Sequence, residues 1–199
     1  MNKDLMLDKI AQKGYDVFYA ANLNFATYDI VRRVPSMVSF LSIAIGVLGL
    51  VFESFRVVGV SVSILLLGIA SLYVEKFTSN VEEYCKRGSL NTDMFNKLKN
   101  LYYRVKETPA SKSDFNDIET QYEAIEQEFQ LSSSAKQIFF ANWYAHYKMF
   151  VVKDYKWMDD RLHFKWWKDK VPGSAKVVLF LILAIIILIL VLNWNNGLV

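Results

Sequence analysis

Two long apolar blocks dominate the hydropathy pattern of this chain. The first extends from Val34 to Val74 and is interrupted by charge only at Glu53-Ser-Phe-Arg56, whereas the second extends from Val177 to Trp194. A run of about 18 apolar residues with few charges is long enough to cross the hydrocarbon core of a bilayer. The pattern therefore predicts three membrane spans, over residues 35–52, 57–73 and 177–194.

The first two predicted spans are joined by a very short break, so they must lie side by side and run in opposite directions. Pro35 suits the first position of a helix, because its missing N–H would have no partner there anyway. We therefore expect the first span to begin at Pro35. Pro172-Gly173-Ser174 separates the third span from the residues before it.

The polar segments show helical rather than strand-like spacing. Residues 1–34 read as an amphipathic cytosolic helix, with apolar side chains recurring at roughly helical intervals. Residues 74–171 are expected to form a cytosolic helical region in three parts. The second span continues into the first part with a break at Gly88-Ser89, a second helix covers Asp114 to about Leu131, and a third covers Ala135 to about Lys168. The fold class predicted is all-α: a transmembrane hairpin, a cytosolic helical bundle and a third, C-terminal transmembrane helix.

The distribution of Lys and Arg predicts the orientation. Five lie in residues 1–35, one in the hairpin tip, seventeen in residues 74–176 and none after residue 192. Cytoplasmic loops are enriched in positive charge. The N-terminus and residues 74–176 are therefore expected in the cytoplasm, and the hairpin tip and the C-terminus outside, in a multi-pass membrane protein.

The sequence contains no recognisable catalytic chemistry. It has no phosphate-binding loop, no HExxH and no nucleophile elbow. The single cysteine, Cys85, excludes an intramolecular disulfide, and neither His146 nor His163 has a partner at a metal-binding spacing. We therefore predict a protein that is not an enzyme, with no cofactor and no metal site. Nine charged residues among the first 33 also argue against a cleaved signal peptide.

Charge is divided between two cytosolic segments. Residues 114–131 contain six carboxylates and no Lys or Arg, whereas residues 136–176 contain nine Lys or Arg, four Asp and eleven aromatic residues. In one interpretation the acidic and basic helices face one another, and the aromatic side chains form the core or the membrane interface. In the other, the basic segment binds an anionic ligand such as a nucleotide or oligonucleotide. The residues predicted for that role are Tyr144, Lys148, Lys153, Lys156, Trp157, Arg161 and Lys165.

Small and polar residues form a stripe along the first span. Its members, at spacings of three or four residues, are Ser39, Ser42, Gly46, Gly49 and Glu53. Small residues let membrane helices approach closely, so the stripe could serve hairpin packing within one subunit. Alternatively it lines a pore, with Glu53 forming an acidic ring that favours cations. Two or three helices cannot enclose a pore, so conduction requires a homo-oligomer, a tetramer or similar.

Three segments of the chain resemble the SLATT family. They are DIVRRVPSMVSFLSIAIGVLGLV, then LLLGIASLYVEKF, then FNKLKNLYYRV with its step at Leu98, Leu101 and Tyr102. The resemblance lies in the layout of an N-terminal helix, a tight hairpin and a long cytosolic helix, and covers roughly residues 10 to 165. The third span departs from the family layout of two, and no site residue is transferred from the family.

The resemblance implies a prokaryotic membrane effector of anti-phage and conflict systems. Such an effector forms an oligomeric pore in the lipid bilayer and depolarises the cell. Its signal is a nucleotide or oligonucleotide made by a partner enzyme, often a nucleotidyltransferase. Together with the stripe and the basic segment, this predicts a ligand-gated ion channel. The alternative is a membrane anchor or adaptor for a cytosolic partner, without conduction.

Overall fold

The computed structural model describes residues 2–109, 115–131, 136–152 and 155–196, and every regular element in those ranges is a helix. The predicted all-α class is confirmed. Helix α1 covers Lys3–Val51, a 3₁₀ turn covers Glu53–Phe55, and helix α2 covers Val58–Glu75. The charged break thus forms the tip of the predicted hairpin.

Helix α1 passes through Pro35 without interruption, so the predicted helix start at this proline is wrong. Its 49 residues give a length of about 73 Å at 1.5 Å per residue. Pro35 leaves the carbonyl of Val31 without its helical partner, a loss that membrane helices tolerate where a neighbouring helix packs alongside. The amphipathic segment and the first span are consequently one continuous helix.

Helix α3, Val81–Glu107, packs antiparallel to the N-terminal half of α1. The rings of Phe18 and Phe95 stack at 4.4 Å between centroids, and Phe25 lies against Gly88. The predicted break at Gly88-Ser89 is wrong, because α3 continues through it and the chain instead breaks at a 3₁₀ turn over Thr78–Asn80. A Cβ at Gly88 would lie 2.9 Å from the Phe25 ring, so this glycine permits close helix packing.

Helix α4, Asn116–Leu131, is the predicted acidic helix, and within one chain its described ion pairs are with α1 and α3 rather than with the basic segment. Glu126 pairs with Lys13 of α1 at 2.6 Å, and Asp117 pairs with Arg104 of α3 at 2.8 Å. Tyr122, which belongs to this helix, is buried. The apolar face of α4 therefore packs on the α1–α3 pair, and its carboxylates meet the cations that border that surface.

The predicted single helix from Ala135 to Lys168 is also wrong. The described parts form α5 (Ala141–Tyr147), a π-helical turn over Lys148–Val152, α6 (Lys156–Leu162) and a second π-helical turn over Trp166–Lys170. Phe140 and His163 adopt positive φ, at 67° and 49°. One straight helix would spread eleven aromatic residues around all its faces. Because the segment is broken, Met149, Trp157 and Met158 can all point into the core.

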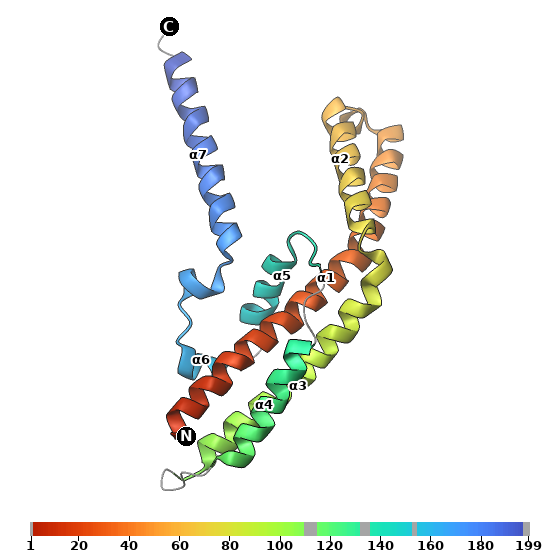
Figure 1. The fold of residues 1–199 in the computed structure, drawn as a ribbon. Helices are drawn as coiled ribbons and strands as arrows, with labels where there is room; N and C mark the ends of the chain where they lie inside the picture. Colours follow the sequence, from red (N-terminus) through yellow and green to blue (C-terminus); the bar gives the residue numbers. More distant parts are fainter. Residues whose placement is uncertain (1, 110–114, 132–135, 153–154, 197–199) are drawn as a thin grey trace.

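Helix α7, Gly173–Asn196, contains the predicted third span. By length and composition, α1, α2 and α7 can each cross a membrane, which confirms the prediction of three membrane-spanning helices. Figure 1 shows α7 rising from the bundle on the same side as the hairpin, but standing apart from it. In the most apolar window of α7, 0% of the residues are buried. No other described part of the chain covers this surface, so it is available to contact lipid or other proteins.

Candidate functional sites in the bundle and the hairpin

Trp157, predicted to bind a ligand, is part of the bundle core. Its side chain is 2% exposed, and its ring lies 5.0 Å from that of Tyr102 and 5.6 Å from that of Phe95. The missing side chain of Gly14 makes room for it, because a Cβ there would lie 2.5 Å from the indole. A base cannot stack on a ring that is already covered on both faces by the bundle.

Two of the predicted cations connect the basic segment to α1. Arg161 pairs with Asp4 at 3.0 Å and with Asp8 at 3.6 Å. The ammonium group of Lys148 forms an ion pair with the half-buried Asp29 and lies 4.6 Å from the centre of the Tyr144 ring. Tyr144 is half-buried, so this group of side chains is occupied with internal contacts.

The remaining predicted cations lie apart from these. Lys153 falls outside the described residues, and Lys156 is exposed on α6. Lys165 lines a pocket, together with residues that the sequence did not single out for binding. The structure therefore divides the predicted basic-aromatic surface, and of the six residues that the structure describes only Lys165 lies in this pocket.

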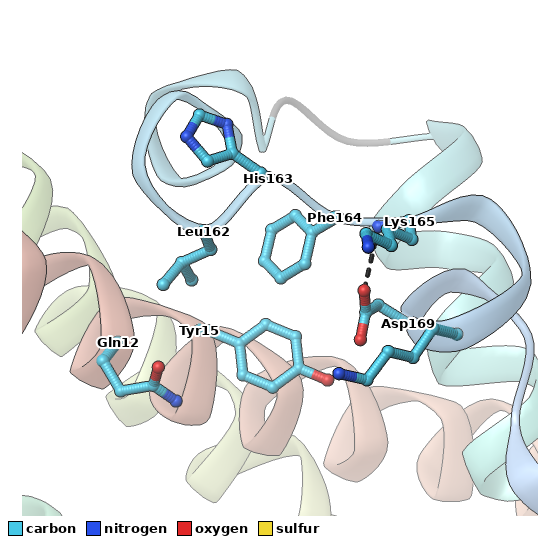
Figure 2. Close-up of a pocket in the computed structure, with 8 residues that line it drawn as sticks. Gln12, Tyr15, Leu162, His163, Phe164, Lys165 and Asp169 are labelled. Atoms are coloured by element: carbon cyan, nitrogen blue, oxygen red, sulfur yellow. Dashed lines mark hydrogen bonds between the residues drawn. The ribbon is translucent and has the colours of Figure 1, made fainter.

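The pocket has a volume of about 350 Å³ and lies between the N-terminal part of α1 and the segment after α6 (Figure 2). That volume is in the range of small-molecule sites. The segment is held by short-range hydrogen bonds: the backbone N–H of Phe164 donates to Asp159 at 2.7 Å, and that of Lys165 donates to Asp169 at 2.8 Å. The lining residues are Gln12, Tyr15, Leu162, His163, Phe164, Lys165, Lys168 and Asp169.

The lining offers charge, hydrogen-bond donors and ring faces. Burial, and to a lesser extent the neighbouring Tyr19, raises the pKa of the Tyr15 phenol, so the hydroxyl remains a donor at neutral pH. The Tyr15 and Phe164 rings lie 5.3 Å apart on one wall. Lys165 and Lys168 carry two positive charges, against the single carboxylate of Asp169. Such a lining can hold a small anion that also has an apolar or aromatic part.

Sequence reasoning missed most of this pocket for an identifiable reason. His163 has no local partner that marks it, Lys168 fits the membrane-flanking charge equally well, and Tyr15 belongs to the apolar rhythm of α1. Only the tertiary packing brings Tyr15 to the segment that follows α6. A signal in the sequence would have been the excess of lysine over acid beside His163 and Phe164.

The small-residue stripe of the first span is divided between two environments. Ser42 and Gly49 are half-buried, and a Cβ on Gly49 would lie within 4.0 Å of Phe55 and Arg56 at the hairpin tip. Ser39 and Gly46 are exposed, and no atom lies within 4 Å of the Cβ position at Gly46. One half of the stripe is thus partly covered by the chain itself, and the other half is exposed.

Glu53 lies beyond the end of α1, in the 3₁₀ turn at the hairpin tip. Its side chain is 93% exposed, and its distance to Arg56 is 4.0 Å. An exposed ion pair at that distance contributes little free energy. Among the residues that the structure describes, no three His, Cys, Asp or Glu side chains are grouped so as to hold a metal ion.

The chain is a helical membrane protein with three apolar spans on one side of a helical bundle. Its hairpin carries a partly exposed small-residue stripe, and its bundle contains a basic pocket. The model of SMODS and SLOG-associating 2TM effector domain 6, a SLATT family, matches residues 1–179. The chain belongs to this family, and it is a membrane effector of conflict systems. The comparisons with curated proteins and with solved structures give no match.

The match locates the family's two transmembrane segments. It covers the whole hairpin and the cytosolic bundle but ends two residues after Val177, where the apolar part of α7 begins. The two spans of the family are therefore those of α1 and α2. Nearly all of the third span lies beyond the matched residues.

Proposed function

We propose that this protein is an oligomeric, pore-forming ion channel that acts in prokaryotic anti-phage defence by depolarising the inner membrane. The observation that carries the proposal is the exposed part of the stripe, Ser39, Gly46 and Glu53, which hairpin formation leaves uncovered. Because one hairpin cannot enclose a pore, these residues can line a water-filled pore only when several copies assemble around an axis. A tetramer or similar ring places Glu53 at the outer mouth, with the N-terminus in the cytoplasm.

A nucleotide or oligonucleotide, made by a partner nucleotidyltransferase, is the proposed signal. The pocket at Tyr15 and Lys165 is the proposed receptor site, because it combines two ammonium groups with ring faces. Helix α1 carries both Tyr15 and the stripe, so a displacement at the pocket reaches the membrane along one uninterrupted helix.

Conduction is tested in bacteria with a membrane-potential dye. Expression of the chain together with the nucleotidyltransferase that makes its signal should depolarise the cells, and Gly46→Leu should abolish this effect by filling the open face. Val47→Leu is the matched control, because Val47 is exposed but lies about 100° around the helix from Gly46. Unchanged potential and growth when the wild-type chain is expressed with that enzyme would contradict the pore.

Gating is tested separately by binding of ATP and of cyclic di-AMP to the purified full-length protein. The double change Lys165→Gln and Lys168→Gln should weaken binding about tenfold or more, because each removes a charge-assisted contact to phosphate. Lys86→Gln on the exposed side of α3 is the control. Equal binding by the double variant and the control would exclude this pocket as the receptor.

The alternative function is a non-conducting anchor or adaptor for a cytosolic partner. It is favoured by the half-burial of Ser42 and Gly49, because packing within the hairpin then accounts for part of the stripe. In that case Glu53→Gln leaves ion flux and selectivity unchanged, whereas a pore with an acidic ring loses preference for cations.

A further inference from the structure

A second pocket lies at the joint between the cytosolic bundle and α7. Its volume is about 410 Å³. Aromatic side chains from α5, from both π-helical turns and from the start of α6 form its walls, among them Trp143, Phe150, Tyr155 and Trp166, and Lys170 contributes the ammonium group. Pro172 and Ala175, at the start of α7, complete the lining. None of its residues lines the pocket at Tyr15 and Lys165.

The charged group of this pocket is held in place by its aromatic neighbours. The ammonium group of Lys170 donates to the hydroxyl of Tyr155 at 2.7 Å and lies 4.8 Å from the centre of that ring. Nδ1 of His146, which also lines the pocket, is buried and has no hydrogen-bond partner. Burial, followed by the charge of Lys176, lowers the pKa of His146, so the imidazole is neutral at pH 7. The pocket is therefore apolar in its walls and positive at one point.

Its position is set by the start of the third span. Ala175 lines the pocket, and the apolar run of α7 begins two residues later at Val177, a rise of about 3 Å along a helix. Large apolar side chains at the pocket's edge are exposed, with Val151 at 68% and Trp166 at 69%. Aromatic residues concentrate at the level of the lipid headgroups. The pocket thus opens where a helix passes from the headgroup region into the hydrocarbon core.

We propose that this pocket binds one anionic phospholipid, with the lipid phosphate on Lys170, the glycerol against the aromatic walls and an acyl chain along α7. An ammonium group next to apolar walls, continuous with a bare transmembrane helix, matches a ligand that has a phosphate and a hydrocarbon tail. This inference does not depend on conduction or on nucleotide binding.

The bound lipid would strengthen a joint that has few contacts of its own. Among the described residues, the side-chain hydrogen bonds from α5 to α7 are those that Asn142 and the Trp143 indole donate to Ser174, at 3.1 and 2.8 Å. A phospholipid that touches both Phe150 and Ala175 adds contacts on the opposite side of Trp143. The orientation of the bundle relative to the third span then depends on lipid composition.

The test is native mass spectrometry of the full-length protein in detergent, titrated with phosphatidylglycerol and with phosphatidylcholine. Phosphatidylglycerol should bind about tenfold more tightly, and Lys170→Gln should remove that preference. Lys165→Gln, a lysine five positions away that lines the other pocket, should retain it. Equal binding of the two lipids by the wild-type chain, or an equal loss in both variants, overturns the proposal.

Two further measurements distinguish a bound phospholipid from a bound soluble anion. Ala175→Phe fills the pocket while leaving Lys170 in place, so it should also weaken phosphatidylglycerol binding, and full retention would overturn the proposal. Inorganic phosphate at millimolar concentration should not displace the lipid. Displacement would overturn the proposal and assign the pocket to a soluble anion instead. Nucleotide binding by Lys170→Gln is expected to be unchanged, so failure here and failure of the proposed receptor pocket are distinguishable.

Discussion

At the scale of single residues, the role that the sequence suggests for a side chain can differ from its role in the fold. Trp157 belongs to a basic, aromatic segment, and such segments can bind nucleic acids or nucleotides. In the structure it fills the core against Gly14, Phe95 and Tyr102. Its neighbours in space come from α1 and α3, and no local pattern identifies them.

Gly14→Ala tests the packing of this tryptophan. The added methyl group would lie 2.5 Å from the indole, and we expect the crowding to exceed the gain in helix propensity, with a net loss of about 1–2 kcal/mol in the free energy of unfolding. Thermal unfolding in detergent measures the change. Gly68→Ala, inside α2 with no atom within 4 Å of its Cβ position, serves as the control and should not be destabilised. Equal stability of the two variants would show that the core is loosely packed here.

Lys148→Met tests whether this lysine is structural or binds ligand. The change leaves the half-buried Asp29 without its closest cation, and loss of one partner from such a pair is costly. We expect a loss of about 1–3 kcal/mol in stability with unchanged affinity for ATP and cyclic di-AMP. Differential scanning fluorimetry and a binding titration on the same sample provide both values. A selective loss of nucleotide binding would show that Lys148 contributes to the ligand site.

At the scale of elements, the continuity of α1 is the main departure from local expectation. Proline disfavours a helix interior because it removes one hydrogen bond and crowds the preceding turn. Here the flanking residues Val31 and Val38 are both buried, and α2 packs beside the span. This packing outweighs the local penalty and keeps the cytosolic and membrane halves of α1 in one helix.

Cysteine cross-linking tests which face of α1 meets other copies. In a Cys85→Ser background, Gly46→Cys should form disulfide-linked dimers when membranes are treated with a mild oxidant, because two outward-facing stripes then approach one another. Val47→Cys is the control, as it is 57% exposed on another face of the same helix. Dimers are resolved by non-reducing electrophoresis. Cross-linking at Val47 and not at Gly46 would place a different face at the subunit interface.

At the scale of the whole molecule, all three spans rise from one side of a single helical bundle (Figure 1). This arrangement agrees with an N-terminus and a bundle on one side of the membrane and a C-terminus on the other. Helix α7 stands apart from the hairpin, and the family match ends at its beginning. The third span is therefore an addition to the two-span unit.

Reporter fusions test the orientation and the independence of α7. Alkaline phosphatase, which is active only outside the cytoplasm, should be active when it follows residue 196 and inactive when it follows Val171. A chain that ends at Val171 should still fractionate with the membrane, because both spans of the hairpin remain. Phosphatase activity after Val171 would reverse the predicted topology.

Local chemistry alone determines the membrane class of this protein and the positions of its spans. An apolar run of sufficient length has few alternatives to the bilayer, so hydropathy locates all three spans. The sequence likewise predicts the acidic helix to within two residues of its start in the structure, because the acidic residues of its first turn lie within the segment itself.

Only the tertiary structure decides how the polar part is arranged. Gly88 reads locally as a helix break, yet it permits the approach of Phe25 from α1. The acidic helix pairs with α1 and α3 because its apolar face must be buried there, and the basic segment breaks so that Met149 and Trp157 reach the core. These outcomes depend on contacts between residues that are distant in the chain. Periodicity along the sequence cannot encode them, and for the same reason both pockets become visible only in the folded protein.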